Sequence, residues 1–386
     1  MAQGCKTFEF AAVQCDMPDS KKFTNMSFSE LNDDMISEIL SFCNLKQVLS
    51  SIMLVCKKWY THSFDLKHLQ FSKTFWMSEV LDDGKTLQSF RNLCQSSASH
   101  FVSDLSLHHN FAKCAKYYLS SPYLKNVTKL QLGHNESDKS GSSLQAFKEL
   151  IQSEYVKNVT ELNLHRYRLE DAGIICMTQS SYLKNLTCFK TYWNGFELEG
   201  ITLMSSHAMF SNLTHLEMTD VKGDTAFKYI CDSPNFKQLT HLDIGQSYIT
   251  NLGMEYLANS PYLTQLQVLK LDRCNFDGEG VRLLCESNNS IPLKELDFEY
   301  TYIGDEGVKY IAQSPNMKNL TSLGICNTDS GNEAAKYIAQ SPYLSAYLCI
   351  RYEQYDPYYE GKFIDAEGEK LLDNRTVVAS EDDENL

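Results

Sequence analysis

The amino-acid sequence predicts an α/β solenoid shaped as a horseshoe, with a parallel sheet on its concave face and helices on its convex face. Three observations predict this fold class. A short apolar pattern returns at a nearly constant interval, amphipathic helical segments follow its copies, and serine–proline pairs end several of those segments. Together they indicate a stack of similar strand–helix units.

The repeated pattern is an apolar residue, two further residues, a second apolar residue, one further residue and a third apolar residue, as in Leu266, Leu269 and Leu271. The middle residues follow one another at intervals of 25, 32, 27, 27, 26, 27, 27 and 27 residues. This period and consensus are the signature of leucine-rich repeats. The middle residues are Leu105, Leu130, Leu162, Phe189, Leu216, Leu242, Leu269, Leu296 and Leu323.

A helical segment follows the strand pattern in the regular repeats. Residues 253–258, 280–285 and 307–312 each place apolar side chains at i, i+3 and i+4, which is one face of a helix lying on the sheet. Proline cannot continue a helix, so pairs such as Ser260-Pro261 and Ser314-Pro315 end these segments. With this period and helical return, the repeats resemble the ribonuclease-inhibitor-like and cysteine-containing classes.

The composition restricts the kinds of partner. The chain has 386 residues and a formal net charge of −14, which argues against non-specific binding to nucleic acid or to an anionic membrane and favours protein partners with basic patches. Its start resembles no signal peptide, and no apolar stretch approaches the ~20 residues of a membrane span. Its 13 cysteines include no pair at zinc spacing, so we expect no metal site and reduced thiols in the cytoplasm or nucleus.

Glycosylation sequons are the one feature that points to a secreted protein. Five of them share one register of the repeat, just before the strand, and begin at Asn126, Asn158, Asn185, Asn212 and Asn319. Repeat geometry explains this register without any sugar.

Residues 28–60 differ from the repeats and predict three short amphipathic helices. Leu31 and Asp34 open the segment, Ile39-Leu40 and Phe42 follow, and Val55-Cys56-Lys57-Lys58-Trp59 close it. In this order the residues resemble an F-box, although Asn32 stands where the family usually has proline. The alternative is a plain helical cap on the open end of the solenoid.

The resemblance implies a substrate-recognition subunit of a Skp-cullin-F-box ubiquitin ligase. The F-box would dock a Skp-type adaptor, and through it a cullin-RING ligase, while the repeats hold a protein substrate. The chain would need no cofactor and would not be an enzyme itself. The adaptor-binding residues carried over from the family pattern are Leu31, Asp34, Ile36, Ile39, Leu40, Leu45, Leu49, Val55, Cys56 and Trp59.

The sequence divides into four parts. Residues 1–26 are expected to be a weakly ordered leader, 27–62 the F-box-like unit, 63–375 the solenoid with its C-terminal cap, and 376–386 an acidic disordered tail. Residues 66–71 look like a first, irregular repeat, and residues 75–94 look like its helical return.

The concave face is the expected substrate surface, because solenoids present extended binding surface there. Alternate strand residues point into it, and several are acidic, so we expect a contiguous acidic patch edged by two aromatic residues. Ordinary solvated charges are the alternative interpretation. The predicted substrate-binding residues are Trp193, Glu217, Asp243, Asp272, Glu295, Asp297, Glu299 and Tyr300.

The sequence contains no recognisable catalytic motif: it shows no phosphate-binding loop, nucleophile motif or metal cluster. Two further functions stay open. One is an adaptor-independent interaction scaffold of the ribonuclease-inhibitor type, and the other is a GTPase-activating protein built on leucine-rich repeats.

Overall fold

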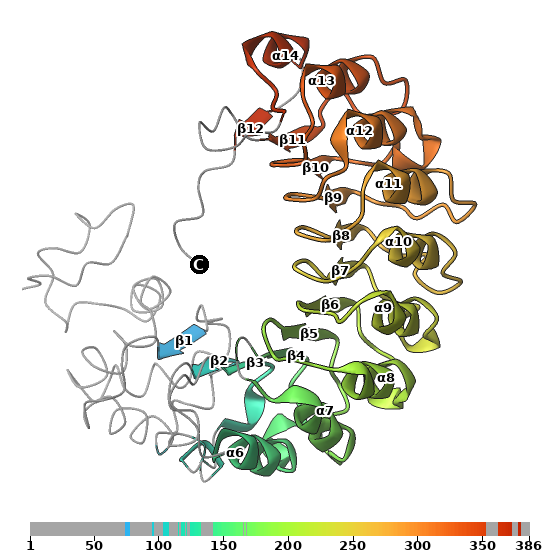
Figure 1. Cartoon of the computed structure of the whole chain (residues 1–386). Coiled ribbons are helices and arrows are strands. Elements are labelled where there is room, and N and C mark those ends of the chain that lie inside the picture. Colours follow the sequence, from blue (N-terminus) through green and yellow to red (C-terminus); the bar gives the residue numbers. More distant parts are fainter. Residues whose placement is uncertain are drawn as a thin grey trace, which may run out of the picture.

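The computed structural model shows a curved arc in which strands line the inner side and helices cover the outer side (Figure 1). It describes residues 74–77, 95, 103–107, 115, 117–119, 121, 124–132, 142–164, 166, 168–352, 362–372 and 377–379. The predicted leader, the F-box-like unit and the residues proposed to bind the adaptor lie outside the described residues.

The described strands form one parallel sheet of 12 strands in sequential order. The middle apolar residues of the repeats align directly, since Leu216 pairs with Leu242, which pairs with Leu269. The sheet consists of β1 (Thr74–Met77), β2 (Asp104–Leu107), β3 (Lys129–Leu132), β4 (Glu161–Asn163), β5 (Cys188–Thr191), β6 (His215–Met218), β7 (His241–Asp243), β8 (Val268–Lys270), β9 (Glu295–Asp297), β10 (Ser322–Gly324), β11 (Cys349–Tyr352) and β12 (Val377–Ala379). The α/β leucine-rich-repeat horseshoe predicted from the sequence is therefore confirmed.

Helices return the chain along the convex side, and the three helical segments predicted from apolar spacing lie in α10, α11 and α12. In the part of the chain that the structure describes, no helix is long and apolar enough to cross a membrane. The α-helices are α6 (Ser142–Ile151), α7 (Glu170–Thr178), α8 (Leu198–Ser206), α9 (Asp224–Cys231), α10 (Asn251–Ala258), α11 (Gly278–Cys285), α12 (Gly304–Gln313), α13 (Asn332–Ala339) and α14 (Ala366–Leu371). Short 3-10 helices precede several strands: η4 (Leu124–Asn126), η5 (Glu154–Val156), η6 (Ala208–Phe210), η7 (Pro234–Phe236) and η8 (Pro315–Met317).

The hydrophobic core runs as one layer between the sheet and the helices. Leu242, Leu269 and Leu296 are fully buried in it, and Phe276 packs edge-on against Phe298 with ring centroids 5.1 Å apart. Burying such side chains stabilises the fold by roughly 1.5–3 kcal/mol each. Because every repeat contributes to the same layer, each one packs mainly on its two neighbours.

Threonine hydroxyls link the repeats ahead of the strands. Thr187 Oγ1 donates to the Thr160 carbonyl, Thr214 to Thr187, and Thr240 to Thr214. Thr187 and Thr214 are also the third residues of two sequons, and in the first of these the Asn185 side chain donates to the Lys157 carbonyl over 2.7 Å. The sequon register therefore serves hydrogen bonding between repeats.

Serine hydroxyls link the convex side in the same way. Ser314 Oγ donates to the Cys285 carbonyl over 2.8 Å, and Ser260 donates to the Cys231 carbonyl. The serine of the Ser-Pro pair at 314 thus caps η8 and also satisfies the end of the preceding repeat's helix.

Both ends of the sheet correct the sequence prediction. Residues 74–77 form strand β1, paired in parallel with β2, where a helical return was expected from Phe75. At the other end, residues 377–379 form strand β12 on β11, although the acidic tail was expected to begin at residue 376. Aromatic and β-branched residues in these two short segments suit strands, which period analysis overlooked because neither segment carries the leucine pattern.

Candidate functional site: the concave face and its rim

The six predicted acidic residues lie together on β6 to β9 and on the residues that follow those strands. The residue that directly follows the middle apolar residue of each repeat points into the concave face. At this position Lys190 pairs in register with Glu217, Glu217 with Asp243, Asp243 with Lys270 and Lys270 with Asp297. The acidic patch is therefore interrupted by basic side chains, and the expectation of a contiguous acidic surface is wrong.

Tyr192 organises the N-terminal part of this surface. Its hydroxyl lies 3.1 Å from Glu217 Oε2 and 3.0 Å from Asp243 Oδ2, and Lys190 Nζ lies 2.9 Å from Glu217 Oε1. Burial, followed by the two carboxylates, raises the pKa of Tyr192 far above its usual value. Burial also raises the pKa of Asp243, although the Gly245 N–H and the Tyr192 hydroxyl oppose that shift.

Arg351 neutralises the C-terminal part. Its guanidinium donates to Asp297 Oδ2 over 2.8 Å and to Glu299 Oε1 over 2.9 Å, and Asp297 is only 8% exposed. Burial and the neighbouring Asp297 nevertheless raise the pKa of Glu299. Arg351 lies on β11, two strands beyond Asp297 on β9. The neutralising cation of this part of the surface therefore comes from a later repeat.

The carboxylate of Asp272 has no close basic partner among the described residues. Its closest basic atom in an ion pair among the described residues is Arg273 Nε at 4.0 Å, whereas Glu295 lies 3.4 Å from Lys270 Nζ. Burial, then the charges of Asp243 and Asp297, raise the pKa of Asp272 to about 7. A carboxylate shifted this far is a candidate functional group, because a basic partner would relieve the cost of its charge.

Two stacked histidines occupy the centre of the concave face, where the sequence offered no distinguishing signal. The rings of His215 and His241 lie 3.9 Å apart with an interplanar angle of 14°. Burial lowers the pKa of both, helped by Lys190 for His215 and by His215 for His241. A small pocket of ≈ 190 Å³ opens beside His241, between Tyr192 and Lys270.

The two predicted aromatic residues lie at the rim, where the loops leave the carboxyl ends of the strands. Trp193 is 49% exposed and Tyr300 is 44% exposed. Arg273 stacks over Tyr300, with its guanidinium carbon 3.9 Å from the ring centroid. Both aromatic residues have a left-handed backbone, with φ of 56° and 57°. The same fourth position after the middle apolar residue is left-handed in Arg166, Trp193, Asp220, Gln246, Arg273, Tyr300 and Asn327.

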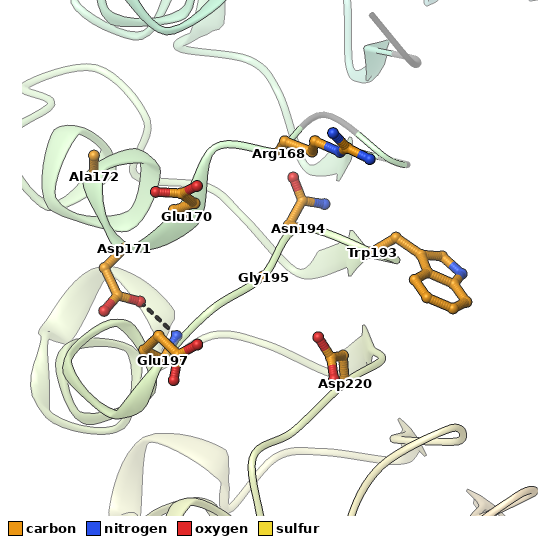
Figure 2. A pocket seen from close by; sticks show the side chains of 9 residues that line it. All are labelled: Arg168, Glu170, Asp171, Ala172, Trp193, Asn194, Gly195, Glu197 and Asp220. Atoms are coloured by element: carbon orange, nitrogen blue, oxygen red, sulfur yellow. Dashed lines mark hydrogen bonds between the residues drawn. The ribbon is translucent and has the colours of Figure 1, made fainter. Parts of the chain in front are cut away.

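A larger pocket, which we call the rim pocket, lies between the loops that follow β4, β5 and β6 (Figure 2). Its volume is ≈ 660 Å³. Arg168 lies above the Gly195 backbone in the view of Figure 2, Asp220 and Glu197 lie below it, and Trp193 stands to the right. The remaining lining residues are Glu170, Asp171, Ala172 and Asn194.

Buried hydrogen bonds fix the floor of the rim pocket. The Asn194 amide donates to the Leu164 carbonyl and to the Tyr192 carbonyl, the latter over 3.1 Å, so it joins two successive loops. The Trp193 N–H donates to Thr219 Oγ1 over 2.9 Å. These bonds hold the backbone of Trp193 in its left-handed conformation, which a large side chain adopts rarely.

The sequence prediction missed this pocket apart from Trp193. Its lining residues carry no motif, and they stand 27 residues apart or in adjoining loops. The sequence offers one signal for it. Large or charged residues recur at the fourth position after the middle apolar residue, which is left-handed in successive repeats.

Three of the described cysteines do not resemble nucleophiles. Burial raises the pKa of Cys188, Cys274 and Cys285 to about 12. Thiols with so high a pKa stay protonated at neutral pH and react slowly. Within the described ranges, no group of three or more potential metal ligands comes together.

Two family models match the sequence. The F-box domain model matches residues 28–70, which include all ten predicted adaptor-binding residues, and the leucine-rich-repeat model matches residues 289–312, which span β9 and most of α12. No curated protein matches the chain.

Two solved structures are similar to the chain at low sequence identity. An internalin from Listeria monocytogenes is similar over 74% of this chain and 70% of its own, with 18% identity and a TM-score of 0.41. A yeast complex of Rad7 and Elc1 is similar over 72% of this chain and 77% of its own, with 13% identity and a TM-score of 0.48.

Proposed function

This chain is an F-box protein with leucine-rich repeats, and from that premise we propose that it is the substrate-recognition subunit of a Skp-cullin-F-box ubiquitin ligase. The observation that carries the proposal is the presence of both modules in one chain. An F-box domain matches residues 28–70, and the repeat arc begins by strand β1 at residue 74.

The adaptor half of the proposal rests on the matched F-box. A Skp-type adaptor would bind apolar side chains within the segment 31–59, among them Leu40 and Trp59. It would connect the chain to a cullin-RING ligase. A unit of this length would bury little of its own surface and would gain stability from a partner.

The substrate half rests on the repeat arc. Its concave face and rim offer exposed aromatic side chains at Trp193 and Tyr300 and an unbalanced carboxylate at Asp272. We propose that a protein substrate with a basic surface binds there, because its cations would contact the carboxylate and the aromatic faces.

In this proposal the chain acts by proximity and makes or breaks no covalent bond. Holding adaptor and substrate on one stiff body raises the effective concentration of substrate lysines near the conjugating enzyme. The free thiols of the repeats fit a reducing compartment, so we propose the cytoplasm or nucleus as its location.

A pull-down with the full chain tests the adaptor half. The double variant Leu40→Asp with Trp59→Ala should lose binding to a Skp-type adaptor. Its matched control is Leu252→Asp with Tyr302→Ala, which changes exposed side chains on and beside the convex helices and should bind normally. Circular dichroism and thermal melting should show that both variants keep the fold of the repeats.

Adaptor binding that survives the Leu40 and Trp59 changes would reject the assignment of those residues. A wild-type chain that binds no Skp-type adaptor would reject the ligase function, and the adaptor-independent scaffold would then be the better interpretation.

A further inference from the structure

We propose that the rim pocket binds the positively charged side chain of a lysine or arginine in an extended segment of the protein substrate. This inference rests on the proposed function and adds to it the chemistry and the place of recognition. The pocket's volume of ≈ 660 Å³ is ample for one long side chain with its flanking backbone.

The charge of the rim pocket selects a cation. Four carboxylates line it, from Glu170, Asp171, Glu197 and Asp220, against the one guanidinium of Arg168. Asp220 pairs with Lys222 over 2.6 Å, and Asp171 accepts the Glu197 backbone N–H over 2.9 Å.

The Asp171 contact belongs to the fold. In other repeats the same kind of bond joins successive helix starts, for example from the Thr250 N–H to Asp224 Oδ1 over 2.8 Å. Glu170 and Glu197 make no ion pair within the described part of the chain and are exposed, so they remain available to a ligand.

Trp193 supplies the second element of the pocket. Trp193 and Asp220 occupy the same position in neighbouring repeats, and both line the rim pocket (Figure 2). An indole face attracts cations more strongly than the other aromatic side chains do, and a nearby carboxylate adds to that attraction.

The protein itself contains a similar contact on the same rim. Arg273 lies over the ring of Tyr300, 3.9 Å from the ring centroid, and Lys222 lies 5.8 Å from the centroid of Tyr248. The Trp193 ring has no such partner among the described residues, so the corresponding place at the rim pocket is open to a cation from another molecule.

Part of the pocket lining has a left-handed backbone. Of the ten described non-glycine residues with positive φ, four line the rim pocket: Trp193 and Asp220 at the position that is left-handed throughout the repeats, and Arg168 and Glu170 outside it. Such conformations cost free energy and persist where the surroundings hold them, and they gather at binding sites. Here the hydrogen bonds of Asn194 and Thr219 hold the backbone around Trp193 before any ligand arrives.

The rest of the rim gives the segment its direction. Tyr248, Tyr300 and Tyr302 are exposed on the loops that follow β7 and β9. A substrate segment anchored at Trp193 could lie across these rings, and its backbone carbonyl groups could accept hydrogen bonds from Arg168.

The test uses the full chain labelled with 5-fluorotryptophan. The chain has three tryptophans, so a Trp193→Phe variant assigns the ¹⁹F signal of Trp193. The probe is a decapeptide of glycine and serine with one central arginine, and its neutral counterpart carries citrulline at that place. The arginine peptide should shift the Trp193 signal saturably, while the citrulline peptide should bind at least about tenfold more weakly.

The double variant Glu170→Gln with Glu197→Gln should weaken binding of the arginine peptide by roughly three- to tenfold, because each exposed ion pair contributes modestly. The matched control is Glu255→Gln with Glu367→Gln, two exposed glutamates on α10 and α14, which should bind as the wild type does.

Equal binding of the arginine and citrulline peptides, an unchanged affinity in the Glu170 and Glu197 variant, or no saturable shift would each overturn the inference. Adaptor pull-down with the same proteins separates it from the proposed function. A wild-type chain that binds the adaptor but not the arginine peptide refutes only the rim pocket, and a wild-type chain that binds the peptide but no adaptor refutes only the ligase function.

Discussion

Replacing Asp272 by asparagine should make the protein more stable above neutral pH. Asp272 is half-buried near the charges of Asp243 and Asp297, and its pKa is raised from 3.8 to about 7. In the unfolded chain an aspartate titrates near pH 4. The folded protein therefore binds this proton more tightly than the unfolded chain does, so folding stability increases as pH falls from above 7 towards 4.

The magnitude follows from the size of the shift. About three pKa units correspond to ~4 kcal/mol at pH 8, where the carboxylate is ionised in both states. The Asp272 side chain is 25% exposed and Arg273 Nε lies 4.0 Å away, so solvent and that cation reduce the penalty. We expect Asp272→Asn to gain ~1–3 kcal/mol in unfolding free energy at pH 8 and almost nothing at pH 4.

Urea unfolding followed by circular dichroism at pH 8, 6 and 4 measures this difference. The matched control is Asp232→Asn, an exposed aspartate on the convex side paired with Lys228 at 2.8 Å, which should change stability by less than ~0.5 kcal/mol at every pH. A gain at Asp272 that is the same at pH 8 and pH 4, or a loss at pH 8, would refute the reasoning.

Two further changes test the contacts between repeats. Ser260→Ala removes a buried hydroxyl that donates to the Cys231 carbonyl and should cost ~1–3 kcal/mol in urea unfolding; an unchanged midpoint would contradict a structural role for the serine contacts. Arg351→Met leaves the carboxylates of Asp297 and Glu299 without their shared cation and should cost ~2–4 kcal/mol at pH 7. Adding Glu299→Gln to the Arg351 variant should recover part of that loss, and strictly additive losses would argue against the pairing.

The leucine ladder could be predicted from the sequence because period and packing impose the same constraint. A residue such as Leu242 must lie beside Leu216 and Leu269 if each repeat is to bury its apolar face, so equal spacing in sequence becomes equal register in space. The two outermost strands escaped prediction because they lack that spacing.

The sequence shows which charged side chains point into the concave face, but it does not show which of them form ion pairs or hydrogen bonds with one another. Alternation along a strand shows that Asp297 points into the concave surface, yet its cation comes from Arg351, 54 residues further along the chain. The link from Tyr192 to Asp243 likewise spans 51 residues and depends on the lengths and rotamers of the side chains. Strand alternation contains neither piece of information.

The rim pocket depends on backbone conformation, which the side-chain pattern does not reveal. Trp193 is a residue type that rarely adopts a left-handed backbone, so its side chain does not identify its loop as a place where a cavity forms. The residues proposed to bind the adaptor lie outside the described residues, and their assignment rests on the F-box match at residues 28–70.

The bend of the arc limits what can lie along its inner edge. Neighbouring strands lie about 4.8 Å apart, whereas packed helices need roughly 8–10 Å, so the outer layer is forced to fan out. A long, straight helix would contact such a concave surface at only a few points, whereas a flexible, extended polypeptide could follow it from Trp193 to Tyr300. Macrocyclic or extended peptide mimics are therefore a better starting point for blocking this surface than stapled helices.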